Sequence, residues 1–239
     1  MALKTGDGEL GHQRRHRRWS SGSSAIDVLV ILSMLQRAST VYLSKASAAL
    51  PSVSTTPVIS NAQRQKLDSA LRVDQAGEIA ANYIYMGQML VLQRTNPQLK
   101  PLIQDMWDQE KRHIEVMDKL QVQHRVRPTL LTDVAKIAGF GLGAATALMG
   151  KEAAMACTEA VETVIGEHYD DQLKQMEELP SDHPSIPLLR DVIREFRDDE
   201  LEHLDIAVEN DAQRAPAHAL LSSIIGAGCK VAIELCKRV

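Results

Sequence analysis

The heptapeptide WDQEKRH at residues 107–113 returns ninety positions later as RDDELEH at residues 197–203. Each copy has an Asp, then a Glu two positions on, then a His three positions after that Glu. On an α-helix, Glu-x-x-His places both side chains on one face, one turn apart. One such pair is commonly a solvated helix face, but two in a chain with only 8 His residues suggest paired metal ligands.

Apolar residues flank both pairs at helical spacing. The first series is Leu99, Ile103, Met106, Glu110, His113, Met117 and Leu120, and the second is Ile186, Leu189, Ile193, Phe196, Glu200, His203 and Ala207. This spacing of three and four residues is typical of the inward face of a bundle helix. A buried carboxylate loses much of its solvation free energy unless it is neutralised, paired or bound to a metal.

Two further segments carry a single Glu on an inward-facing series. The first is Leu71, Asp74, Glu78, Ala81 and Tyr85, and the second is Met155, Thr158, Glu162, Ile165 and Tyr169. Glu78 precedes Glu110, and Glu162 precedes Glu200, so a helix with one Glu is twice followed by a helix with Glu-x-x-His. This order indicates a degenerate internal duplication of a helical hairpin.

Two single Glu residues and two Glu-x-x-His pairs form the known ligand set of ferritin-like di-iron and di-manganese bundles. The expected ligands, catalytic through the metals they hold, are Glu78, Glu110, His113, Glu162, Glu200 and His203. Four carboxylates balance the charge of two divalent ions, and oxygen with imidazole nitrogen suits iron or manganese. The pattern leaves open whether Glu110 and Glu200 bridge both ions or bind one each.

Neighbouring residues allow two interpretations. Asp108, Asp198 and Asp199 are either acceptors for the N–H groups of the ligand histidines or surface charges. Tyr169 follows Glu162 by seven residues on the same face, so it is either a catalytic residue lining the site or a packed core tyrosine.

The hexapeptide GFGLGA at residues 139–144 has the outline of a dinucleotide-binding fingerprint. That fingerprint needs a preceding strand in a βαβ unit, and no strand pattern is evident here. We therefore expect no Rossmann site; the small residues either allow close helix packing or make a flexible apolar surface.

The composition favours an all-α protein that does not bind nucleic acid. Hydrophobic residues make up 44% and charged residues 24%, the net charge is −4, and aromatic residues are only 3%. Proline positions leave helical stretches at about 62–94, 98–125, 129–149, 150–178, 186–213 and 216–238. The predicted fold is a ferritin-like four-helix bundle with an apolar crossover helix and an additional C-terminal helix. The 3 cysteines match no zinc pattern and are expected to be free thiols.

Residues 1–60 differ from the rest. They contain an arginine cluster, and no Asp or Glu occurs from Val28 to Leu67. This chemistry is typical of a mitochondrial presequence, which would be cleaner if translation began at Met34. A plain disordered tail is the alternative. The predicted division is a presequence at 1–60 and a ferritin-like di-iron domain at 61–239.

Several motifs together resemble the demethoxyubiquinone hydroxylases of ubiquinone biosynthesis. They are RVDQAGE, MWDQEKRH, GFGLGAATALMGKEAAMACT, AVE at 160–162, and RDDELEH. The similarity runs from about Leu67 to the C-terminus, and the family's motifs fall on the same six ligands. The chain departs from the family pattern at Gln75, where His is frequent, and at Ser69, where some members have Arg.

The resemblance implies a di-iron monooxygenase with two iron ions, which uses O₂ and electrons from NADH to hydroxylate the ring of a polyprenyl quinone precursor. It also implies a peripheral location on the matrix side of the mitochondrial inner membrane, in a ubiquinone-biosynthesis complex with a lipid-binding accessory protein. The apolar segments at 130–149 and in the last helix suit a membrane surface without crossing it, and we expect no transmembrane helix. The rival functions are ferritin-type iron storage and a non-catalytic scaffold of the complex.

Overall fold

The computed structural model describes residues 57–239. Every element described below belongs to the unit of residues 56–239. Of the presequence expected over residues 1–60, only the last four positions lie within the described residues. The alternative start at Met34 lies outside them, so both expectations stay predictions.

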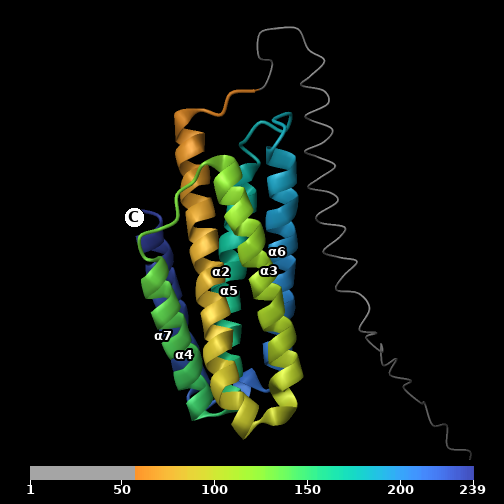
Figure 1. Ribbon diagram of the computed structural model, residues 1–239, viewed down its shortest axis with the longest axis vertical. Helices are drawn as coiled ribbons and strands as arrows, with labels where there is room; N and C mark the ends of the chain where they lie inside the picture. Colours follow the sequence, from red (N-terminus) through yellow and green to blue (C-terminus); the bar gives the residue numbers. More distant parts are fainter. Residues whose placement is uncertain (1–56) are drawn as a thin grey trace, which may run out of the picture. The chain divides into compact units, whose positions relative to one another are not determined.

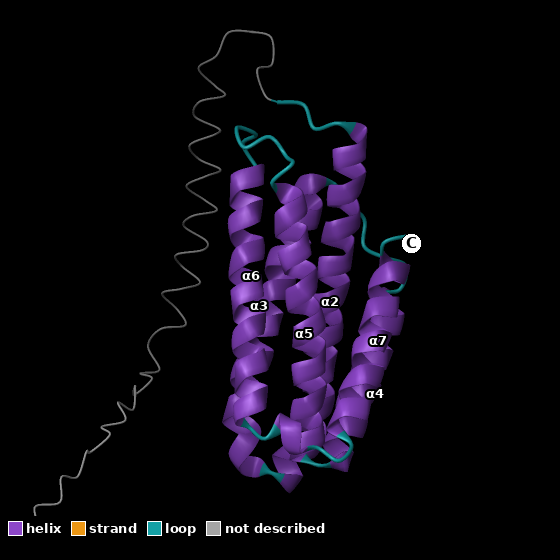
Figure 2. Cartoon of the chain, turned by 180° about the vertical axis from the view of Figure 1, so that it is seen from behind, coloured by secondary structure: helices purple, strands orange, loops and turns teal. Residues whose placement is uncertain are grey.

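Residues 57–239 are helical and contain no strand, which confirms the all-α prediction (Figures 1 and 2). The long helices are α2 (Asn61–Thr95), α3 (Lys100–His124), α4 (Thr132–Met149), α5 (Lys151–Met176), α6 (Ile186–Glu209) and α7 (His218–Cys236). Two short 3-10 turns, η1 (Pro97–Leu99) and η2 (Ala212–Arg214), connect them. Each long helix matches one predicted stretch.

The helix ends follow from local sequence. Ser60 accepts a hydrogen bond from the Gln63 backbone N–H, and the Gln63 side chain accepts one from the Ser60 N–H, which is a capping box at the start of α2. Between α4 and α5, Gly150 has φ 124°, a conformation that residues with a Cβ rarely adopt. This residue lets the chain turn directly from the crossover helix into the bundle.

Helices α2, α3, α5 and α6 form the bundle, and its interior is layered. One apolar cluster includes Leu92, Ile103 and Met155. A second apolar cluster includes Leu71, Met117 and Ile193. Along each helix the predicted ligands lie between residues of these two clusters, so a polar layer crosses the bundle between two apolar layers. The apolar layers fix the four helices on both sides of the site.

Helix α4 lies against α2 at very short range. A Cβ added to Gly139 would be 2.6 Å from the Ala80 carbonyl oxygen, and one added to Gly143 would overlap the Ile84 carbonyl oxygen. Gly139 and Gly143 of GFGLGA therefore allow close helix packing, as predicted, and the segment is helical in the described structure.

Helix α7 packs on α5 through Ile225 and Cys229 and leaves much apolar surface exposed, including Leu220 and Ile224. Helix α4 likewise exposes Ile137 and Leu148. Among the described helices, α7 alone is long and apolar enough to cross a bilayer by length and composition, with a mean hydropathy of 1.6. The sequence analysis expected no such helix, because it judged the apolar runs as interfacial.

Candidate dimetal centre

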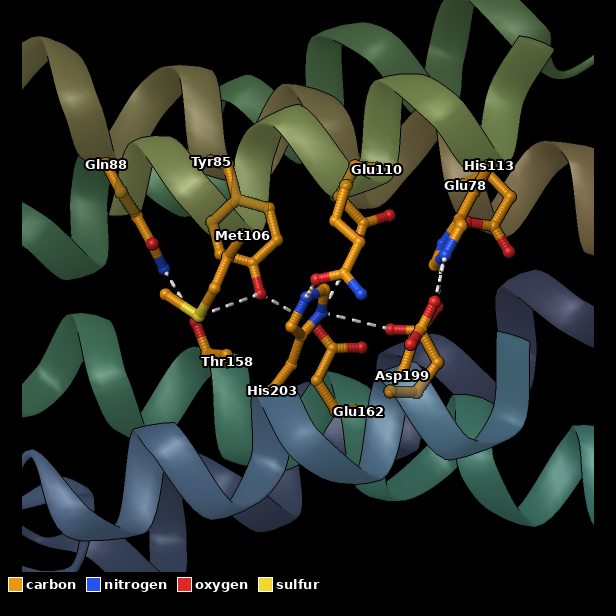
Figure 3. Close-up of polar contacts among 12 residues, drawn as sticks. Glu78, Tyr85, Gln88, Met106, Glu110, His113, Thr158, Glu162, Asp199 and His203 are labelled. Atoms are coloured by element: carbon orange, nitrogen blue, oxygen red, sulfur yellow. Dashed lines mark hydrogen bonds and ion pairs between the residues drawn. The ribbon is translucent and has the colours of Figure 1, made fainter. Parts of the chain in front are cut away.

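The bundle brings all six predicted ligands into one interior layer. Glu78 comes from α2, Glu110 and His113 from α3, Glu162 from α5, and the second Glu-x-x-His pair from α6 (Figure 3). Each of the six side chains belongs to a buried residue that is at most 3% exposed. Helical spacing dictates this result locally, since the apolar neighbours of each ligand set the inward face.

The ligand atoms form two overlapping groups. One group is Glu78, Glu110, His113 and Glu200, and the other is Glu110, Glu162, Glu200 and His203. Within each group the candidate ligand atoms lie within 4.8 Å of one another. Glu110 and Glu200 belong to both groups, so they occupy the positions that could bridge two ions. The packing of α3 against α6 therefore favours the bridging alternative that the sequence left open.

Buried atoms without partners show that this layer is suited to cations. Both carboxylate oxygens of Glu110, one oxygen each of Glu162 and Glu200, and Nδ1 of His203 make no hydrogen bond of good geometry, although the imidazole and the carboxylates face one another. Unpaired buried acceptors are costly, and native structures contain few of them. Two divalent ions bound between the groups would satisfy these atoms and balance the four carboxylates, so the residues fit a dimetal site.

The two imidazoles have the same orientation. Nδ1 of His113 faces Glu78 Oε2 at 3.2 Å and Glu200 Oε1 at 3.3 Å, while its Nε2 lies 3.0 Å from Asp199 Oδ2. Nδ1 of His203 faces Glu110 Oε1 at 3.2 Å and Glu200 Oε2 at 3.3 Å. Its Nε2 lies 3.1 Å from Gln109 Oε1. In both rings Nδ1 thus faces the candidate ligand carboxylates, and Nε2 faces a neighbouring side-chain oxygen that can accept its proton.

These contacts decide between the two interpretations of the aspartates. Asp199 is the acceptor for His113, whereas Asp108 bonds to Lys111 and Gln104, and Asp198 bonds to Arg197. The sequence analysis did not name Gln109. The available signal was its position directly before Glu110, which corresponds to that of Asp199 directly before Glu200.

Two tyrosines hold the single glutamates in a reciprocal way. Tyr85 on α2 donates to Glu162 Oε1 on α5 at 3.1 Å, and Tyr169 on α5 donates to Glu78 Oε1 on α2. Tyr169 is buried in the second apolar cluster and its hydroxyl reaches a candidate ligand, so it combines features of both interpretations, and its catalytic role stays a prediction. Tyr85, which the sequence analysis placed only on an inward face, occupies the equivalent position. Burial, followed by the charge of the bonded Glu, raises the pKa of both phenols well above 10, so both remain donors.

Burial also sets the protonation of the metal-free site. It raises the pKa of Glu78 from 4.5 to about 8, and it raises the pKa values of Glu162 and Glu110, with the charge of Glu200 adding to the effect. Burial opposes ionisation of Glu200 too, but the imidazoles of His113 and His203, each 3.3 Å away, outweigh it and lower its pKa to about 2. Burial would lower the pKa of each histidine, yet the facing carboxylates raise both well above 6.5.

One departure from the family pattern lies beside this layer. Gln75 is buried on α2, and its amide donates to Asp118 Oδ1 on α3 at 2.5 Å. One residue before it, Asp74 accepts hydrogen bonds from His168 and Gln172 on α5. Gln75 therefore ties two bundle helices together through a hydrogen bond to Asp118.

Comparison with known proteins identifies the family. The family model for "Ubiquinone biosynthesis protein COQ7" matches residues 65–236. The "NADPH-dependent 3-demethoxyubiquinone 3-hydroxylase, mitochondrial" of Homo sapiens is 52% identical over 181 residues, 75% of this chain and 81% of that protein. The "5-demethoxyubiquinone hydroxylase, mitochondrial" of Saccharomyces cerevisiae is 46% identical over 192 residues, 76% of this chain and 82% of that protein.

A bacterial relative extends the similarity. The "3-demethoxyubiquinol 3-hydroxylase" of Rhodospirillum rubrum is 46% identical over 175 residues, covering 72% of this chain and 78% of that protein. The similarity spans all six bundle and flanking helices and includes the whole polar layer. This chain belongs to the COQ7 family of ubiquinone biosynthesis proteins.

Proposed function

We propose that this protein is a di-iron monooxygenase that hydroxylates the ring of a demethoxyubiquinone with O₂, a late step of ubiquinone biosynthesis. The observation that carries the proposal is the pair of overlapping buried ligand groups, which share Glu110 and Glu200. They lie in a chain of a family whose relatives are named as demethoxyubiquinone hydroxylases. Two bound iron ions would supply the one-electron chemistry that activates O₂.

The chain's own residues have separable tasks. Glu78 with His113 and Glu162 with His203 would hold one iron ion each from opposite halves of the bundle, and Glu110 and Glu200 would bridge them. Tyr85 and Tyr169 orient the single glutamates by donating to one carboxylate oxygen each. The apolar layers on both sides exclude water, which strengthens the electrostatic interactions among these groups.

The electron source in this proposal is a reduced nicotinamide. The resemblance in sequence led us to expect NADH, whereas several related proteins, including the human one, are named NADPH-dependent. The fingerprint-like segment GFGLGA lies within α4 and packs on α2, so the proposal involves no Rossmann-type site there. Comparing NADPH with NADH in the assay below distinguishes the two reductants.

The same proposal places the protein at the matrix surface of the mitochondrial inner membrane, in a quinone-synthesis complex with a lipid-binding accessory protein. Exposed apolar residues on α4 and α7 support contact with a membrane surface, where a polyprenyl quinone is dissolved. The eukaryotic relatives carry the word mitochondrial in their names.

The test combines the iron-loaded full chain, a short-tailed demethoxyquinone, NADPH or NADH, and ¹⁸O₂. Mass spectrometry of the quinone should find one heavy oxygen atom in a new ring hydroxyl. Glu200→Gln should abolish the labelled product, while Glu202→Gln, an exposed neighbour on the same helix, should leave it unchanged. Oxidation of iron and consumption of O₂ without any label in the quinone would refute the hydroxylase and favour iron storage.

A further inference from the structure

The two halves of the bundle are related residue by residue around the dimetal layer. The residue before each bridging Glu contacts the imidazole of the opposite helix: Asp199 contacts His113 at 3.0 Å, and Gln109 contacts His203 at 3.1 Å. The single glutamates are equally matched, because each accepts a hydrogen bond from a tyrosine of the opposite half. The site is therefore nearly two-fold symmetric in its hydrogen bonds.

The symmetry is broken at the acceptors of the two imidazoles. His113 donates to a carboxylate, whereas His203 donates to a neutral amide oxygen. The two metal positions share Glu110 and Glu200, and each adds one single Glu and one His. Counting the acceptors, the position at His113 has one more negatively charged group beside it than the position at His203.

A charged acceptor changes the ligand that it touches. A carboxylate that accepts the outer N–H of a metal-binding imidazole fixes the ring and raises the basicity of the metal-facing nitrogen. Such a charge-assisted hydrogen bond is also stronger than a bond between neutral groups. His113 is further held by Phe196, whose ring stacks on it at a centroid distance of 4.0 Å, while His203 meets Tyr85 edge-on at 5.8 Å.

We propose that the two metal positions are inequivalent, and that the position at His113 binds a divalent cation more tightly than the position at His203 because Asp199, not an amide, supports its imidazole. The inference rests on the dimetal site of the proposed function. Asp199 and Gln109 both act as positioning residues, and Asp199 supports its imidazole more strongly. The position at His113 therefore fills before the position at His203.

The test uses the full chain freed of metal with a chelator and titrated with Co²⁺, followed by visible absorption and calorimetry. Glu162→Gln leaves the His113 position intact, and Glu78→Gln leaves the His203 position intact. We expect the first variant to bind one Co²⁺ about 10- to 100-fold more tightly than the second. Helix content measured by circular dichroism verifies that both variants fold.

Isosteric changes at the acceptors identify the cause. Asp199→Asn should weaken Co²⁺ binding about 10- to 100-fold in the Glu162→Gln background and leave the Glu78→Gln background unchanged. Gln109→Glu should tighten binding only in the Glu78→Gln background. Asp198→Asn is the matched control, because it removes the same charge from the adjacent residue, whose side chain bonds to Arg197 instead of an imidazole. It should change the Co²⁺ affinity of neither background.

The outcomes separate this inference from the function on which it rests. Equal affinities in the two single-position variants, or an equal effect of Asp199→Asn in both, would overturn the inference while the dimetal site stood. Uptake of fewer than two Co²⁺ by the unaltered protein would overturn both. If a single-position variant did not fold, titration of the unaltered protein would serve. Asp199→Asn must then weaken Co²⁺ binding only at the tighter of the two positions.

Discussion

Replacing Glu78 with Gln should stabilise the metal-free protein, and the gain should grow with pH. Burial raises the pKa of Glu78 from its ordinary value of 4.5 to about 8. A group whose pKa is raised by folding contributes its full stability below pH 4.5, and that contribution is lost as the pH rises toward 8. Within this window the unfolded chain releases a proton that the folded chain retains, which favours unfolding.

The magnitude follows from linkage. The free energy of unfolding of the unaltered, metal-free protein should fall by about 1.4 kcal/mol per pH unit from this carboxyl, and by about 3 kcal/mol between pH 4.5 and pH 7. Gln does not titrate, so Glu78→Gln removes this slope. Glu78 faces His113 at 3.2 Å, so the two groups titrate together and the slope belongs to the pair.

The assay is urea unfolding of both proteins in excess chelator from pH 5 to pH 8, with Glu202→Gln as an exposed control on α6. The difference in unfolding free energy between Glu78→Gln and the unaltered protein should increase with pH, while the control stays parallel to the unaltered protein. Burying an amide and burying a carboxyl differ in free energy by an amount that does not depend on pH. This amount cancels when only the slopes against pH are compared. Parallel curves for Glu78→Gln and the unaltered protein would refute the assignment of a neutral buried Glu78.

Three further predictions concern the site and its support. Co²⁺ binding should release protons at pH 7 and tighten from pH 6 to pH 8, because the raised pKa values of Glu78, Glu162 and both histidines keep protons in the metal-free site. Calorimetry in buffers of different ionisation enthalpy measures the proton release. A binding enthalpy independent of buffer, with an affinity independent of pH, would contradict this prediction. Tyr85→Phe should alter the visible spectrum of the Co²⁺-loaded protein, because Glu162 loses its donor at 3.1 Å, whereas Tyr83→Phe should not; identical spectra would show that the hydroxyl does not orient the ligand. Gly143→Ala should lower the free energy of unfolding, measured with urea, by about 1–3 kcal/mol, since its Cβ would overlap the Ile84 carbonyl. Gly141→Ala has open space around its Cβ and should raise the free energy of unfolding by about 0.5–1 kcal/mol. Equal effects of the two substitutions would disprove the close contact of α2 and α4.

Hydrophobic periodicity was sufficient to predict the helices and the inward-facing positions of the six candidate ligands. Glu110 and His113 face inward because Met106 and Met117 on the same face must be buried, and this requirement acts within one helix. The same holds for Glu78, between Leu71 and Tyr85 on α2. Such positions depend on the helical repeat alone, so a single sequence determines them.

The contacts between helices could not be read in the same way. Whether Asp108, Asp198 or Asp199 meets an imidazole depends on how far α6 is rotated and shifted against α3, and the packing of the two apolar layers sets both quantities. Tyr169 had two interpretations for the same reason. Gln109 and Tyr85 were missed because each acts on a residue of another helix.

The sequence by itself thus determined the helical class, the family and the six inward-facing ligands, because side-chain direction within a helix repeats with a fixed period. Only the tertiary structure decided that Glu110 and Glu200 belong to both candidate ligand groups, and that a carboxylate faces one imidazole and an amide the other. Those facts depend on the rotation and axial offset of whole helices, which the summed packing of their side chains decides.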